Sequence, residues 1–220
     1  MIDSKGNGHI RVGLFGVSRS GKNYTIDDFR ELAKNNGVEF VHLSPMDMIR
    51  ARLGDRRLRD MSLEEKKELV SEVRAEIDCI AEGYNVIVDE HYCYPATIGG
   101  RKLENGYFDE KIPHKILRSP RYKAEYEVVF PRFEAMKYDL FAVMNIDPEI
   151  IVERARTSEG AKYNPYITAE EVAEWEKVEK EGIILESSVP VMDITDPRRS
   201  GIQLWEIVKS QMGKEAAGND

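Results

Sequence analysis

A glycine-rich run near the start of the chain has the residue types that bind phosphate groups. The run Gly16-Val17-Ser18-Arg19-Ser20-Gly21-Lys22-Asn23 fits the pattern G-x-x-x-x-G-K-[ST] at every fixed position except the last. In such a loop the backbone N–H groups line an anion-binding nest, and the glycines let the backbone approach the phosphates closely. Lys22 would reach the outer phosphates of a nucleotide. The predicted nucleotide-binding residues are Gly16, Ser18, Arg19, Ser20, Gly21, Lys22 and Asn23.

The segments on either side of this run favour phosphate binding over a glycine-rich turn that binds nothing. The apolar run Ile10–Val17 predicts a buried strand, and an amphipathic segment that begins near Lys22 predicts a helix. Strand, glycine-rich turn and helix form the context in which the pattern is specific. The helix N-terminus would add its positive dipole end to the site.

The last position of the pattern affects metal binding more than phosphate binding. A Ser or Thr hydroxyl ligates Mg²⁺ at this place in nucleotide-binding loops, and here Asn23 offers an amide oxygen, which binds Mg²⁺ less often. A second metal-binding candidate is Asp89, which follows the apolar run Val86-Ile87-Val88. Ligands bind at the carboxyl ends of the central strands of open α/β sheets, so this carboxylate would hold Mg²⁺ directly or through water.

Two neighbours of Asp89 are also candidate site residues. Glu90 could bind the metal or act as a base toward an acceptor hydroxyl. A histidine at a strand end, such as His91, is more often a hydrogen-bonded structural residue than a participant in the chemistry.

Alternating apolar runs and amphipathic segments predict how these residues are positioned. Continuous apolar runs are typical of strands that are buried on both faces of a parallel sheet. Helix-start signals separate the runs, among them the capping-box pairs Ser62 with Glu65 and Thr168 with Glu171. We therefore predict an α/β three-layer sandwich with a five-stranded parallel sheet. Its predicted strands are Ile10–Val17, Val38–Ser44, Asn85–Glu90, Asp139–Asp147 and Val191–Asp196.

Length and composition are typical of one globular domain. The chain has 220 residues and a formal net charge of −8, which argues against a body that coats nucleic acid. We predict a single domain over residues 1–212, a basic loop or hairpin inserted at about 95–123, a short lid at about 154–168, and a flexible tail over 213–220. The two cysteines show no disulfide or metal-binding spacing, and no segment is apolar enough to span a membrane. These features favour a cytoplasmic protein without a membrane partner; they leave its oligomeric state open.

Three further segments resemble nucleoside monophosphate kinases of the adenylate kinase type. Asp47-Met48-Ile49-Arg50 resembles the Gly-Asp-Met-Leu-Arg segment after that family's second strand, although Met46 stands where the family has glycine. Asp89-Glu90-His91 is similar to the Asp-x-His of archaeal adenylate kinases. The segment that contains Arg154 and Arg156 resembles the one that leads into the kinase lid.

The resemblance implies a P-loop kinase fold and transfer of the γ-phosphoryl group of ATP to a nucleoside or deoxynucleoside monophosphate, with Mg²⁺. It implies that Arg50 grips the acceptor phosphate, for which a guanidinium offers two parallel donors. It also implies that Arg154 and Arg156 close over the transferring group. The catalytic candidates are Lys22, Asp89, Arg154 and Arg156, and the acceptor-binding candidates are Asp47, Arg50, Glu90 and His91.

Two other functions remain open at this point. The basic segment 101–123 would suit a P-loop kinase that phosphorylates a hydroxyl of a nucleic acid or a modified nucleoside, because such patches bind phosphate backbones. Asn23 would suit a nucleotide-binding module without catalysis, because it lacks the usual metal-binding hydroxyl.

Overall fold

A five-stranded parallel sheet forms the centre of the molecule. The computed structural model describes residues 9–56, 60–95, 97–98, 101–102, 116–117, 126–128, 135–157 and 167–217. The strand order is β10-β9-β1-β3-β2, and every neighbouring pair is parallel. The strands are β1 (Arg11–Phe15), β2 (Val41–Leu43), β3 (Val86–Glu90), β9 (Leu140–Met144) and β10 (Val191–Ile194).

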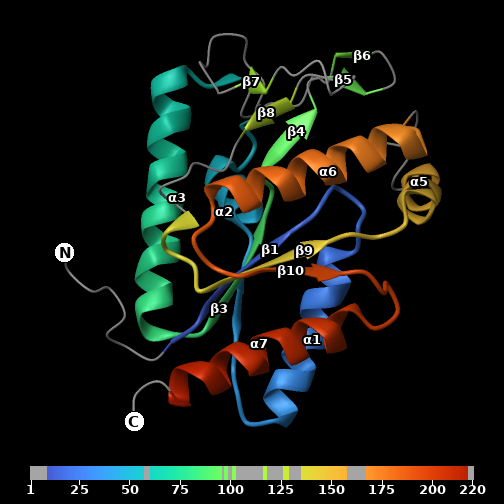
Figure 1. The fold of residues 1–220 in the computed structure, drawn as a ribbon. Helices are drawn as coiled ribbons and strands as arrows, with labels where there is room; N and C mark the ends of the chain where they lie inside the picture. Colours follow the sequence, from blue (N-terminus) through green and yellow to red (C-terminus); the bar gives the residue numbers. More distant parts are fainter. Residues whose placement is uncertain are drawn as a thin grey trace.

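Helices cover both faces of this sheet, so the predicted three-layer α/β sandwich with a five-stranded parallel sheet is confirmed. Figure 1 shows α1 and α7 together on one side of the strands, with α3 and α6 on the other. The described helices are α1 (Lys22–Asn35), α2 (Pro45–Leu53), α3 (Leu63–Gly83), α5 (Pro148–Arg156), α6 (Ala169–Glu186) and α7 (Ser200–Ala217). All five predicted strands are present, each shorter than its predicted range, although β3 ends at Glu90 and β10 begins at Val191 as predicted.

The central strands have both faces buried, as their continuous apolar sequences predict. Every residue of β1 and of β9 is buried. Gly13 in β1 lets the Phe141 ring pack flat on the strand, because a Cβ at position 13 would lie 2.8 Å from a carbon of that ring. This burial fixes the sheet register and therefore the place where each strand ends.

Side-chain caps begin most of the helices. The two predicted capping boxes are confirmed at Ser62 with Glu65 and at Thr168 with Glu171. Helix α1 is different: its N-cap is Gly21, no side chain caps it, and its first turn holds no acidic residue. Its first N–H groups, which have no partner inside a helix, are thus left for another acceptor.

Short antiparallel strands follow β3. Strand β4 (Cys93–Pro95) pairs with β8 (Tyr126–Val128), which pairs with β7 (Ile116–Leu117), and β5 (Thr97–Ile98) pairs with β6 (Arg101–Lys102). Most of the predicted basic insertion at 95–123, and residues 158–166 of the predicted lid, lie outside the described residues.

The C-terminal helix extends further than the sequence predicts. Helix α7 continues to Ala217, into the segment predicted as a flexible tail from residue 213. The residues after Gly213 are Lys214, Glu215, Ala216 and Ala217, all strong helix formers, and they follow a helix that is already packed. A search of the described residues for a helix long and apolar enough to cross a membrane finds none.

Candidate functional site

The loop between β1 and α1 has a backbone conformation that requires its glycines. Gly21 has φ 103° and Arg19 has φ 71°, both in the left-handed region. A Cβ on Gly16 would lie 2.7 Å from the Cβ of Met144 in the neighbouring strand β9. The loop therefore packs directly on the sheet, at the carboxyl end of β1.

The interior of this loop has the properties of an anion site. The N-terminus of α1 is uncapped, and a helix N-terminus attracts negative charge. The Ser20 side chain is buried, and its Oγ has no hydrogen-bond partner within the described part of the chain. Buried hydroxyls are normally paired, so this orphaned oxygen supports the interpretation that the loop receives a phosphate.

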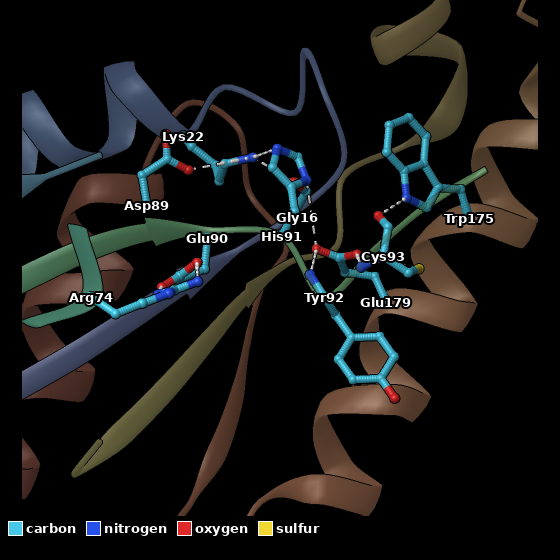
Figure 2. Close-up of polar contacts among 10 residues, drawn as sticks. All are labelled: Gly16, Lys22, Arg74, Asp89, Glu90, His91, Tyr92, Cys93, Trp175 and Glu179. Carbon is cyan, nitrogen blue, oxygen red and sulfur yellow. Dashed lines mark hydrogen bonds and ion pairs between the residues drawn. The ribbon is translucent and has the colours of Figure 1, made fainter. Parts of the chain in front are cut away.

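Lys22 is enclosed at the base of the loop by three acceptors. Its side chain is only 8% exposed. Figure 2 shows its Nζ between Asp89 and His91: Nζ lies 2.5 Å from the carbonyl oxygen of Gly16, 3.1 Å from His91 Nε2 and 3.5 Å from Asp89 Oδ1. The structure thus brings the predicted loop lysine and the predicted strand-end carboxylate together.

Asp89 and Glu90 point to opposite faces of the sheet. Asp89 lies on the loop side, and its Oδ1 is buried without a hydrogen-bond partner among the described residues. Glu90 faces α3, where its carboxylate binds the Arg74 guanidinium with both oxygens and accepts a hydrogen bond from Tyr138 Oη at 2.8 Å. This placement differs from the expectation that Glu90 contacts metal or acceptor, because successive strand side chains alternate between the faces.

His91 links Lys22 to a buried carboxylate on α6. Its Nδ1 lies 3.7 Å from Glu179 Oε1, and Glu179 accepts hydrogen bonds from the backbone N–H groups of Tyr92 at 2.9 Å and Cys93 at 3.0 Å. Burial, reinforced by the Lys22 charge, lowers the pKa of His91 well below its ordinary value, so the ring is neutral at pH 7. Burial raises the pKa of Glu179 to about 7, although the two backbone hydrogen bonds and Lys22 act in the opposite direction.

The predicted arginines have different surroundings. Arg154 Nη1 donates to the carbonyl oxygens of Arg19 at 3.2 Å and Ser20 at 2.9 Å, so it holds the backbone of the loop. Arg156, at the end of α5, is exposed. Arg50 and Asp47 form an ion pair with each other at 2.8 Å on the surface of α2, where both side chains are 66% exposed.

The described residues hold few groups that could bind a metal ion. No cluster of three or more His, Cys, Asp or Glu side chains suited to a metal occurs among them. Mg²⁺ usually keeps several waters and binds through one or two carboxylates plus substrate phosphates. Asp89 fits such a site, because its Oδ1 makes no hydrogen bond among the described residues beyond its 3.5 Å ion pair with Lys22, and Asn23 is exposed on the first turn of α1.

Glu179 is a site residue that the sequence interpretation missed. It lies on α6 in line with the buried residues Val172, Trp175 and Val178. An acidic residue on the apolar face of a helix was the signal that could have drawn attention to it, because unpaired carboxylates are rarely buried. The sequence offered no indication that its partner would be the segment after β3.

Comparisons with known proteins add little to this description. No protein-family model matches the sequence, and no curated protein matches it. Among solved structures, the chain is similar to shikimate kinase from Bacteroides thetaiotaomicron, with 14% identity and a TM-score of 0.49 over 91% of this chain and 98% of that one. It is also similar to a structure of the PezAT chromosomal toxin-antitoxin system of Streptococcus pneumoniae, with 14% identity and a TM-score of 0.46 over 86% of this chain and 72% of that one. Likenesses this distant leave the site to be interpreted from its own residues.

Proposed function

We propose that this protein is an ATP-dependent phosphotransferase. The observation that carries the proposal is the enclosure of Lys22 at the base of an uncapped, glycine-shaped loop, where it forms an ion pair with the strand-end carboxylate of Asp89. Phosphoryl transfer requires little covalent chemistry from the protein; it requires positive charge around the transferring group and correct positioning. A loop lysine, an open helix N-terminus and a strand-end carboxylate are the groups that such a reaction uses.

Each of these residues has a role in the proposed reaction. The loop N–H groups, with the Ser20 hydroxyl, would bind the β- and γ-phosphates of ATP. Lys22 would exchange its present acceptors for phosphate oxygens and neutralise charge that develops during transfer. Asp89 and Asn23 would hold Mg²⁺, which when bound neutralises the phosphates. Arg154 would keep the loop carbonyls turned outward, leaving the N–H groups free to face the phosphates.

For the acceptor, we propose a nucleoside or deoxynucleoside monophosphate. Helix α2 begins directly after β2, so Asp47 and Arg50 follow the same carboxyl edge of the sheet that holds the loop. The Arg50 guanidinium is exposed and could exchange Asp47 for an acceptor phosphate. Arg156 is exposed at the end of α5 and could close over the site from there.

A transfer assay with a panel of acceptors tests this function. Purified protein is incubated with γ-labelled ATP or GTP, Mg²⁺ and each ribo- and deoxynucleoside monophosphate in turn. We expect a labelled diphosphate from at least one acceptor, and about a 10³-fold loss in Lys22→Ala. Lys34→Ala, which removes an exposed lysine from the last turn of the same helix, is the matched control and should retain full activity.

The same panel includes a second candidate class of acceptor, the hydroxyl group. Asp89 favours it, because its Oδ1 accepts no hydrogen bond among the described residues, and a carboxylate beside the loop lysine could take a proton from a hydroxyl. Short DNA and RNA and free nucleosides therefore belong in the panel. Label on one of these and on no monophosphate would favour the hydroxyl kinase, whereas no transfer to any acceptor, with intact ATP binding, would favour a non-catalytic module.

A further inference from the structure

The loop lysine, a histidine and a buried carboxylate form a chain of contacts at the carboxyl end of the sheet. Figure 2 shows His91 between Lys22 and Glu179; Lys22 comes from α1, His91 follows β3, and Glu179 comes from α6. The distances along this chain of contacts are 3.1 Å from Lys22 Nζ to His91 Nε2 and 3.7 Å from His91 Nδ1 to Glu179 Oε1.

The chemistry of Lys22 determines where His91 carries its proton. An ammonium group only donates hydrogen bonds, so His91 Nε2 must accept, and the proton of the neutral ring must then sit on Nδ1. That nitrogen lies 3.7 Å from Glu179 Oε1 and makes no hydrogen bond among the described residues, so the carboxylate acts on it through its charge. When Glu179 is ionised, this charge favours the Nδ1–H tautomer over the alternative, in which an N–H would point at the ammonium group.

The surroundings hold both partners in place. Two aromatic rings pack near the imidazole, with the Tyr94 centroid at 4.7 Å and the Trp175 centroid at 6.2 Å. Glu179 is fully buried, and its two oxygens accept from successive backbone N–H groups, those of Tyr92 and Cys93. The carboxylate cannot rotate without losing these bonds, so its position relative to His91 is fixed by the chain segment that carries the histidine.

A second buried glutamate on the same helix serves as a comparison for a carboxylate whose role is structural alone. Glu176 is also buried, also accepts from a backbone N–H that follows a sheet strand (that of Ile146, at 3.2 Å), and also has its pKa raised to about 7 by burial. Glu179 is likewise buried, accepts from the backbone after a strand and has a raised pKa. It differs from Glu176 in facing the histidine that contacts Lys22.

We propose that Glu179 is a positioning residue for phosphoryl transfer: it fixes the His91 tautomer that accepts from Lys22 and so sets the position of the lysine in the phosphate site. The expected effect on kcat rests on the proposed function, whereas the expected His91 tautomer does not. Helix α6, which carries none of the predicted loop or acceptor residues, thereby becomes part of the phosphate site.

The first test is an NMR measurement that does not depend on phosphoryl-transfer activity. Protein labelled with ¹⁵N in histidine is examined by NMR at neutral pH, and the His91 signals are assigned by their absence in His91→Gln. We expect a protonated Nδ1 and a hydrogen-bonded, unprotonated Nε2. In Glu179→Gln the Nε2–H tautomer should gain population, whereas in Glu176→Gln the His91 signals should keep the wild-type pattern.

The second test separates positioning from binding in the kinetics. In Glu179→Gln we expect kcat to fall about tenfold or more with little change in the acceptor KM, because a misplaced catalytic group costs rate. Glu176→Gln should leave both constants near wild type. His91→Gln, whose amide oxygen can still accept from Lys22, should retain more activity than His91→Leu, which offers no acceptor.

The outcomes that overturn the inference are distinct from failure of the proposed function. A wild-type His91 protonated on Nε2 would overturn it, as would equal effects of the two glutamate substitutions on tautomer and kcat. If Glu179→Gln fails to fold, the wild-type spectrum and the His91→Gln and His91→Leu pair still decide. A protein that transfers no phosphate yet shows the expected tautomers would contradict the proposed function alone.

Discussion

Two neighbouring carboxylates on opposite sides of strand β3 have very different surroundings. On the loop side, Asp89 lies 3.5 Å from Lys22 and has an oxygen without a hydrogen bond among the described residues. On the α3 side, Glu90 binds Arg74 with both oxygens and also accepts from Tyr138. Asp89 has only the long ion pair with Lys22, made by the oxygen that lacks a hydrogen bond, whereas Glu90 has a bidentate ion pair and a hydrogen bond within the fold.

This difference separates a candidate functional group from a structural one more clearly than residue type does. Both residues are acidic, adjacent and at the carboxyl end of a central strand. A buried polar group that is fully paired contributes to the stability of the fold, whereas an orphaned one is a site at which a ligand can supply the missing interaction. The predictions below use substitutions on the two sides to test this distinction.

The largest effect is expected from Asp89→Asn. Loss of the charge removes the proposed metal-binding carboxylate, so we expect kcat for phosphoryl transfer to fall about 10²- to 10³-fold. The melting temperature should change by only a few degrees. Steady-state kinetics and a thermal melt on the same sample check both, and a near wild-type kcat would contradict the assigned role of Asp89.

The reverse pattern is expected from Glu90→Ala. Removing one partner of a buried ion pair leaves Arg74 with an uncompensated charge, so the free energy of unfolding should fall by about 3 kcal/mol. Urea denaturation measures this loss. The double variant with Arg74→Met should recover part of it, and the kcat of the folded fraction of Glu90→Ala should stay within about threefold of wild type. If Asp89→Asn and Glu90→Ala lost kcat equally, the distinction between a functional and a structural carboxylate would be wrong.

A pH effect is expected from Glu176, a buried residue of α6. Its pKa is raised to about 7 by burial, from an ordinary value of 4.5. The folded state therefore binds more protons than the unfolded state between these values, and stability falls as pH rises from about 4.5 to 7. Relative to Glu176→Gln, the wild type should lose on the order of 2 kcal/mol between pH 5 and pH 8.

Urea denaturation of both proteins at each pH measures that difference. Burial lowers the pKa values of His42 and His91, and these groups act in the opposite direction in both proteins, so the comparison with the variant isolates Glu176. An identical pH dependence in the two proteins would show that Glu176 titrates normally.

The smallest effect is expected from Asn23→Thr on the loop side. The substitution restores the hydroxyl that usually ligates Mg²⁺ at this position. The side chain is exposed, so the fold should not change. We expect the Mg²⁺ concentration for half-maximal activity to fall about threefold, measured by metal titration at saturating ATP. No change would remove Asn23 from the metal site.

Sequence alone predicted much of the fold because its signals are local. Continuous apolar runs located the five parallel strands, and the caps at Ser62 and Thr168 marked two helix starts. The strand ends were less well predicted, since the apolar runs extend past the residues that hydrogen-bond to a neighbouring strand. The tail was shorter than predicted, because helix propensity after a packed helix outweighs one glycine.

By itself, the sequence determined that a lysine and a glycine-rich loop follow a buried strand and precede a helix, with an acidic pair at the end of another strand. Only the tertiary structure decided which of the two carboxylates contacts the lysine. The alternation of side chains along the strand and the order of the strands in the sheet determine the face on which each carboxylate lies. It also decided that Glu179, far away in the sequence, approaches Lys22 through His91. Contacts of this kind depend on how α6 packs across the sheet end, and no local pattern encodes that packing.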